Sequence, residues 1–189
     1  MNLSTRPTDT QRIEAVPHAI EILPASPAEA DLHDLAALLR DAVEGGASVG
    51  FMVPLREDEI AVFWQEVFSD AKAGKRIVIA ARAGDRIVGT TQLELAGRPN
   101  SRHRAELQKL LVLRHHRGRG IGQALINAAE SAARANQRRL IVLDTSTSGN
   151  AVNLYVRCGY TCAGVIPRYA CDPDGPLIDT AIYYKELAP

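Results

Sequence analysis

Apolar residues recur at helical spacing in two stretches of the first half of the chain. Residues 27–44 repeat them up to the pair Gly45-Gly46. Residues 56–73 carry large apolar side chains on one helical face, namely Ile60, Phe63, Trp64, Val67 and Phe68. Glycine ends a helix readily because it adopts the left-handed conformation required just after it. The pattern therefore predicts two helices, preceded by a short strand at 19–23, with the aromatic side chains in the core.

Strand-like runs fill the middle of the chain. Residues 76–83 and 86–95 flank Gly84-Asp85, a dipeptide typical of a hairpin. An apolar strand at 105–113, a helix at 121–135 and an apolar strand at 140–143 then form one βαβ unit, whose crossover is expected to be right-handed. These elements predict a sheet that combines antiparallel hairpins with one parallel pair.

The C-terminal part predicts a short helix at 151–157 and two strands, from residue 160 and at 177–185, around a turn at 172–175. The start of the chain differs, because residues 1–17 are rich in Thr, Ser, Pro and charge without any periodicity. We expect a mobile extension at 1–17 and a single domain at 18–189, since 189 residues are enough for one core but short of two full domains.

Composition excludes several function classes. Lysine plus arginine and aspartate plus glutamate both number 22, so no overall field attracts nucleic acid or an acidic membrane surface. No apolar run approaches the ~20 residues of a membrane span, and the polar start lacks a secretion signal. The cysteines Cys158, Cys162 and Cys171 show no metal-ligand spacing, which predicts reduced thiols and no metal. These features predict a cytoplasmic protein.

The most informative stretch joins the central strand to its helix and reads Arg117-Gly118-Arg119-Gly120-Ile121-Gly122. Its glycines let backbone N–H groups approach a ligand, and the helix that begins there directs the positive end of its dipole to the same place. Arg117 and Arg119 add guanidinium groups, whose forked donors match phosphate oxygens. This local positive charge in a neutral protein predicts a pyrophosphate site.

Glycine-rich loops between a strand and a helix also occur in dinucleotide-binding folds and in P-loop proteins. This loop lacks the Gly-Lys-Ser/Thr ending of a P-loop, and it follows several strands, whereas a dinucleotide fold prefers it in the first βαβ unit. Arg-x-x-Gly-x-Gly at this place instead resembles the acetyl-CoA motif of the GNAT N-acetyltransferases. The resemblance extends over about residues 20–187. It implies the GNAT acyl-CoA N-acyltransferase fold, a mixed α/β sheet of about seven mostly antiparallel strands with one central parallel βαβ pair and about four helices.

The resemblance also implies how acetyl-CoA, the cosubstrate, would bind. In this family the strand before the loop pairs its backbone with the pantetheine arm, here through Leu111, Val112 and Leu113, and residues 117–122 hold the pyrophosphate. A later helix usually reads Asn-x-x-Ala-x-x-Leu-Tyr followed by Gly-Phe or Gly-Tyr. Residues 148–155 and 159–160 match, except that Ser148 replaces the asparagine, so Asn150 or Asn153 is expected to make that contact.

Two carboxylates are candidates for base chemistry. Attack on a thioester needs a neutral amine, so a group must accept a proton from the ammonium ion. Glu106 and Asp144 each interrupt an apolar strand, and neighbouring strands would bring them onto one sheet. The stretches GGASVGFM, RAELQKLLVL, LDT and PRYACDPDG resemble the tabtoxin resistance subgroup, which implies substrate binding and base chemistry for carboxylates at these positions. Otherwise Glu106 is an exposed alternating position and Asp144 a strand-end cap.

Tyr155 is the candidate proton donor to the CoA thiolate. A tyrosine hydroxyl, with a reference pKa of ~10, can serve when held within hydrogen-bond reach. The GNAT motif brings its tyrosine against the CoA sulfur, and the alternative is a core tyrosine with a satisfied hydroxyl. The oxyanion would be stabilised by a backbone N–H within residues 111–113. No Cys–His pair is recognisable, which favours direct transfer over an acyl-cysteine.

Three functions remain open: an acetyltransferase on a small-molecule amine, an acetyltransferase on protein amines, and an acyl-CoA sensor without turnover. The apolar loop 45–55 and the hairpin around 169–174 look able to close over a compact acceptor, which favours the first. Amino acids, antibiotics and toxins are the candidate acceptors, with neither nucleic acid nor membrane as partner. By analogy with the fold, the candidate assembly is a homodimer.

Overall fold

One seven-stranded sheet runs through the molecule in the order β1-β2-β3-β4-β5-β7-β6. The computed structural model describes residues 18–147, 149 and 151–188, so the predicted extension 1–17 lies outside the described residues. Only β4 and β5 are parallel, and the other neighbouring strands are antiparallel. The predicted mixed α/β sheet is confirmed. Its strands are β1 (Ala19–Ile22), β2 (Arg76–Ala83), β3 (Arg86–Leu95), β4 (Arg104–Val112), β5 (Leu140–Ser146), β6 (Thr161–Cys171) and β7 (Leu177–Glu186).

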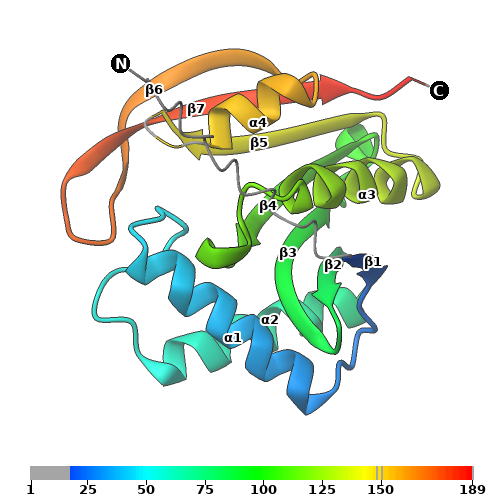
Figure 1. Ribbon diagram of the computed structural model, residues 1–189. Helices are drawn as coiled ribbons and strands as arrows, with labels where there is room; N and C mark the ends of the chain where they lie inside the picture. The colour runs from blue at the N-terminus through cyan, green and yellow to red at the C-terminus, as the bar shows by residue number, and fades with distance from the viewer. Residues whose placement is uncertain (1–17, 148, 150, 189) are drawn as a thin grey trace, which may run out of the picture.

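Helices cover both faces of the sheet (Figure 1). On one face lie α1 (Glu29–Glu44) and α2 (Glu57–Lys72), and on the other lie α3 (Ile121–Ala135) and α4 (Ala151–Arg157). Two short 3-10 turns, at Pro99–Ser101 and Arg114–His116, were not apparent from the sequence. No helix within the described ranges is long and apolar enough to cross a membrane.

The buried strand β2 supplies side chains to two separate cores. Val78 and Ala80 pack with α1 and α2, while Ile79 and Ala81 pack with α3. Successive side chains of a strand point to opposite faces, so a strand covered on both sides reads as an unbroken apolar run. This explains the run at 77–81 and fixes the sheet as the middle of three layers.

A β-bulge in β4 changes which face its side chains reach. Between Thr90 and Gln92 of β3 the pairing shifts, so that β4 has one residue more than its partner, and Lys109 in the bulge has a φ of 50°. Before the bulge Leu107 packs in the α3 core, whereas Leu111, four residues later, packs in the α1/α2 core. An even spacing would keep both on one face, so the bulge reverses the alternation.

Candidate active site

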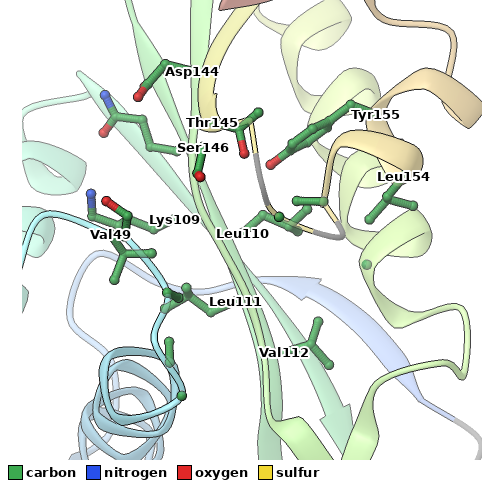
Figure 2. Close-up of a pocket in the computed structure, with 18 of the residues that line it drawn as sticks. Val49, Lys109, Leu110, Leu111, Val112, Asp144, Thr145, Ser146, Leu154 and Tyr155 are labelled. Carbon is green, nitrogen blue, oxygen red and sulfur yellow. The ribbon is translucent and has the colours of Figure 1, made fainter. Parts of the chain in front are cut away.

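A cavity of about 1020 Å³ lies between β4 and β5. The two strands pair only where Arg104 to Glu106 meets Leu140 to Val142, and beyond this point they separate. The walls are residues 106–112 of β4 and Asp144 to Ser146 of β5 (Figure 2). Past the splitting point the cavity-facing edge of β4 pairs with no strand of the described residues, which leaves its backbone available to a ligand.

One end of the cavity is built from the glycine-rich loop. Gly118 and Gly120 have φ values of 76° and 81°, and no other atom lies within 4 Å of where a Cβ would stand on either. The first helical bond of α3 runs from the N–H of Ala124 to the carbonyl of Gly120, so the preceding N–H groups have no acceptor within the helix. Gly118, Gly120, Ile121 and Gly122 all line the cavity. Such a cluster of free donors at a helix start fits an anionic ligand.

Gly122 of α3 lies against Leu154 of α4. A Cβ on Gly122 would lie 2.9 Å from Cδ2 of Leu154. Leu154 and Tyr155 of α4 line the same cavity, so this contact sets α4 beside the loop.

Of the two loop arginines, Arg117 lines the cavity, and its Nε donates to the carbonyl of Val112 at 3.0 Å. Among the described residues, Arg119 does not line the cavity.

The loop is tied to α1 by Asp41. The carboxylate of Asp41 accepts hydrogen bonds from the backbone N–H of Arg114 at 2.9 Å and from its Nε at 2.8 Å. Burial acts to raise the pKa of Asp41, but the hydrogen bonds and the positive charge of Arg114 outweigh it and hold this pKa below its usual value. The ionised carboxylate therefore anchors the segment that precedes the candidate phosphate site.

The edge of β4 presents backbone groups to the cavity in an alternating manner. The N–H of Leu113 donates to the carbonyl of Val88 in β3 at 3.0 Å. Because successive N–H groups of a strand point to opposite sides, the N–H of Val112 points away from β3. Leu111 and Val112 line the cavity, and Leu113 does not.

Tyr155 lies on α4 with its ring buried among aromatic neighbours. Its ring centroid is 5.9 Å from that of Tyr160 and 6.3 Å from that of Tyr183. The side chain points into the cavity toward the end of β5 (Figure 2), and no hydrogen bond among the described residues involves its hydroxyl. Burial raises the pKa of Tyr155 well above its usual value, with Asp144 and Cys158 adding to the effect. The hydroxyl is therefore neutral and able to donate at neutral pH.

Glu106 and Asp144 line the cavity from the same face of the sheet. Glu106 is the register partner of Val142, and Asp144 follows Val142 by two residues. Partners across a strand pair share a face, as do residues two apart within a strand, so both carboxylates project toward the α1/α2 side. Glu106 is half-buried and Asp144 exposed. The predicted proximity on one sheet is found.

A polar network orients Glu106. Nη1 of Arg76 donates to the amide oxygen of Gln108 at 2.8 Å, which turns the amide nitrogen of Gln108 toward Oε1 of Glu106, also at 2.8 Å. Arg76 also donates to Glu94 at 3.0 Å and to Gln92 at 2.7 Å. The arginine fixes the direction of the Gln108 amide, and this amide fixes one oxygen of Glu106.

Lys109 is a lining residue that sequence reasoning missed. The one signal of Lys109 in the sequence is a charged residue inside the apolar strand 107–112. The bulge that directs its side chain produces no recognisable sequence pattern. Asn153 is exposed and is not among the described lining residues, and Asn150 lies outside the part of the chain that the structure describes. Ser148, the third polar position of that motif, also lies outside it.

The loop after α1 and the turn after β6 meet over the cavity. Ser48 Oγ donates to the carbonyl of Cys171 at 2.8 Å, and the N–H of Val53 donates to the carbonyl of Pro173 at 3.0 Å. Residues 45–52 and 170–172 both line the cavity. These hydrogen bonds hold the two segments together where both line the cavity. Among the described residues no group of three or more His, Cys, Asp or Glu could hold a metal ion.

Comparisons with known proteins agree on the family. A streptothricin acetyltransferase of Escherichia coli is 37% identical over 62 residues, 32% of this chain and 36% of that protein. An N-acetyltransferase from the hisH-hisA intergenic region of Azospirillum brasilense is 32% identical over 116 residues, which cover 60% of this chain and 67% of that protein. The structure of a phosphinothricin acetyltransferase from Sinorhizobium meliloti in complex with AcCoA superposes with a TM-score of 0.73 at 18% identity, covering 90% of this chain and 89% of that one.

The predicted GNAT fold is confirmed by this superposition and by the sheet order. A sequence model of the acetyltransferase (GNAT) family matches residues 32–160, more than half of the chain. This chain therefore belongs to the GNAT family of acetyltransferases.

Proposed function

We propose that the protein transfers an acetyl group from acetyl-CoA directly to the amine of a small molecule. The observation that carries the proposal is the continuity of the cavity, which is lined both by the N-terminus of α3 and by Glu106 and Asp144. One end suits a phosphorylated cosubstrate and the other an ammonium ion. A phosphinothricin acetyltransferase whose structure holds AcCoA has the same fold, which supports acetyl-CoA as the cosubstrate.

Acetyl-CoA would bind mainly to backbone groups. The free N–H groups at the start of α3 would accept the pyrophosphate, with Arg117 as a nearby cation. The pantetheine arm would run along the edge of β4 at Leu111 and Val112, where the N–H of Val112 points away from β3. The thioester would then lie between β4 and Tyr155, because both line the cavity past the point where β4 and β5 separate.

The chemistry needs three proton movements. Glu106 or Asp144 takes a proton from the ammonium of the acceptor, and the neutral amine attacks the thioester carbon. A C–N bond forms while a backbone N–H on β4 stabilises the oxyanion. As the C–S bond breaks, the leaving thiolate takes the proton of the Tyr155 hydroxyl, which burial keeps protonated until then. The tyrosine regains a proton from the nitrogen that attacked, which leaves the neutral amide and CoA thiol. Direct transfer requires no group on the protein to carry the acetyl.

The two segments joined beside the cavity favour a small acceptor over a protein. A peptide substrate would need an open groove, whereas residues 45–52 and 170–172 both line the cavity and are held together by the Ser48 and Val53 hydrogen bonds. Relatives named for streptothricin and phosphinothricin agree with an amine-bearing antibiotic or toxin as acceptor.

Free thiols at Cys158, Cys162 and Cys171 agree with a reducing, cytoplasmic compartment.

A homodimer is the assembly that we propose. The edge strand β6 exposes Val165, Ile166 and Tyr169, and edge strands of this kind are normally covered. Sedimentation velocity over a range of protein concentrations tests the assembly, and a monomer throughout would contradict it.

The function is tested by release of free CoA thiol from acetyl-CoA in the presence of amino acids, toxins of the β-lactam amino acid type, polyamines, aminoglycosides and peptides. We expect acceptor-dependent thiol release with at least one small amine and none with peptides. Calorimetry with CoA runs alongside. Binding without turnover on any amine would indicate a sensor, and no binding would refute the proposal.

A further inference from the structure

Lys109 extends from the β4 bulge across the acceptor end of the cavity. Its Nζ lies 3.8 Å from the point where a Cβ on Gly50 would stand, and 5.9 Å from the ring centroid of Phe63. Figure 2 shows the amine beside Val49, on the side of the cavity that also holds Asp144. The left-handed backbone at Lys109 sets this direction, because it arises where β4 carries its extra residue.

Within the part of the chain that the structure describes, the ammonium group of Lys109 makes no hydrogen bond and no ion pair. Its amine lies over the Phe63 ring. The neighbouring cation Arg76 differs, since it donates to Glu94, Gln92 and Gln108. Lys109 is therefore a largely enclosed charge whose donors are free for a ligand.

Two carboxylates lie near this amine without pairing with it. Burial lowers the pKa of Lys109, and the charges of Asp144 and Glu106 offset this only in part. A ligand that carries both signs of charge satisfies all three groups. Its ammonium faces Asp144 and Glu106, and its anion faces Lys109. A simple polyamine would instead meet repulsion from the unpaired lysine.

We propose that Lys109 forms an anion subsite under loop 45–52, and that the acceptor is an amine that also bears a carboxylate. The inference rests on the proposed function and names its acceptor class. The absence of a side chain at Gly50 leaves room over Nζ for the carboxylate, because a Cβ there would stand in ordinary contact with the amine. The Phe63 ring, whose centroid lies 5.9 Å from Nζ, adds a favourable cation–π contact.

The test compares free α-, β- and γ-amino acids with their amides as acceptors, which keep the amine and remove the anion. The proteins are the wild type, Lys109→Met, Lys109→Arg and the matched control Lys75→Met, an exposed lysine outside the cavity. For the wild type we expect amino acids to be acetylated in preference to amides. Lys109→Met should lower kcat/KM for amino acids by about 10- to 100-fold, the effect of losing one charge-assisted hydrogen bond, mainly through KM.

Three further results separate a binding role from a structural one. Lys109→Met should change kcat/KM for the amides by less than about threefold, Lys109→Arg should restore most of the preference for amino acids, and calorimetric CoA binding should match the Lys75→Met control. Equal wild-type activity on acids and amides would overturn the subsite and leave the acetyltransferase intact. A parallel loss for acids and amides in Lys109→Met would also overturn it. No turnover of any amine would refute the function and the subsite together.

Discussion

The two ends of the cavity present different chemical groups to a ligand. The phosphate end consists of backbone: glycines with positive φ, the N–H groups of α3 and the unpaired edge of β4. The acceptor end consists of the side chains of Glu106, Asp144 and Lys109. The β4 bulge directs Lys109, the pairing of β4 with β5 puts the two carboxylates on one face, and the network around Arg76 orients Glu106. Substitutions at the phosphate end should therefore weaken binding of the cosubstrate, and substitutions at the acceptor end should weaken recognition of the acceptor. Tyr155 lies between the two ends, and its substitution should slow only the reaction.

The largest effect is expected at this boundary. Tyr155→Phe removes the hydroxyl and keeps the ring contacts with Tyr160 and Tyr183. We expect kcat to fall by about 10²- to 10⁴-fold, as for other general acids, while CoA affinity changes little. Pre-steady-state thiol release and calorimetry measure the two quantities. Unchanged kcat would remove Tyr155 from the mechanism and leave it a core residue.

The carboxylates at the acceptor end should come next. Glu106→Gln and Asp144→Asn keep the size of each side chain and remove its ability to accept a proton. For the residue that acts as base we expect kcat/KM for the acceptor to fall by about 10²-fold, with KM for acetyl-CoA unchanged. The control is Glu186→Gln, which alters an exposed carboxylate at the end of β7 that does not line the cavity. Wild-type activity in both variants would refute a carboxylate base.

A smaller effect is expected at the phosphate end. Gly120→Ala and Gly84→Ala each put a Cβ on a residue with positive φ and with open space around it. Both should lose about 1–2 kcal/mol of unfolding free energy through backbone strain. Only Gly120→Ala should also weaken acetyl-CoA binding, because Gly120 lines the cavity and Gly84 lies in the β2–β3 turn. Equal affinity in both variants would contradict a phosphate site at the start of α3.

The smallest effect concerns the anchor of the loop. Asp41 has a pKa below its ordinary value of 3.8, so it stabilises the fold fully above this pH and loses that contribution as pH falls through the lowered value. Asp41→Asn should cost about 0.5–1 kcal/mol at pH 7, since Arg114 is half-exposed. In denaturant unfolding, the difference from wild type should shrink as pH falls below 3.8 and vanish once the pH is under the lowered pKa of Asp41. A difference independent of pH would contradict an ionised anchor.

The order of elements was readable from the sequence because each follows from local periodicity. The helix prediction at 121–135 coincides with α3, and the strand predictions at 76–83 and 86–95 coincide with β2 and β3. The glycine-rich loop was equally apparent, since its conformation depends on residues adjacent in the chain. Residues 111–113 show the limit, because Leu111 and Val112 line the cavity and Leu113 does not, a difference that no feature of the sequence indicates.

The acceptor end depended on contacts between distant segments. A bulge shifts the strand register without any periodic signal, and it decides that Lys109 reaches under Gly50. The carboxylates share a face only because Glu106 pairs with Val142, thirty-six positions along the chain. The sequence alone therefore determined the fold class, the order of the elements and the phosphate loop, which rest on short-range periodicity and backbone freedom. The tertiary structure alone decided which side chains meet around the acceptor, because register and bulge are properties of paired strands.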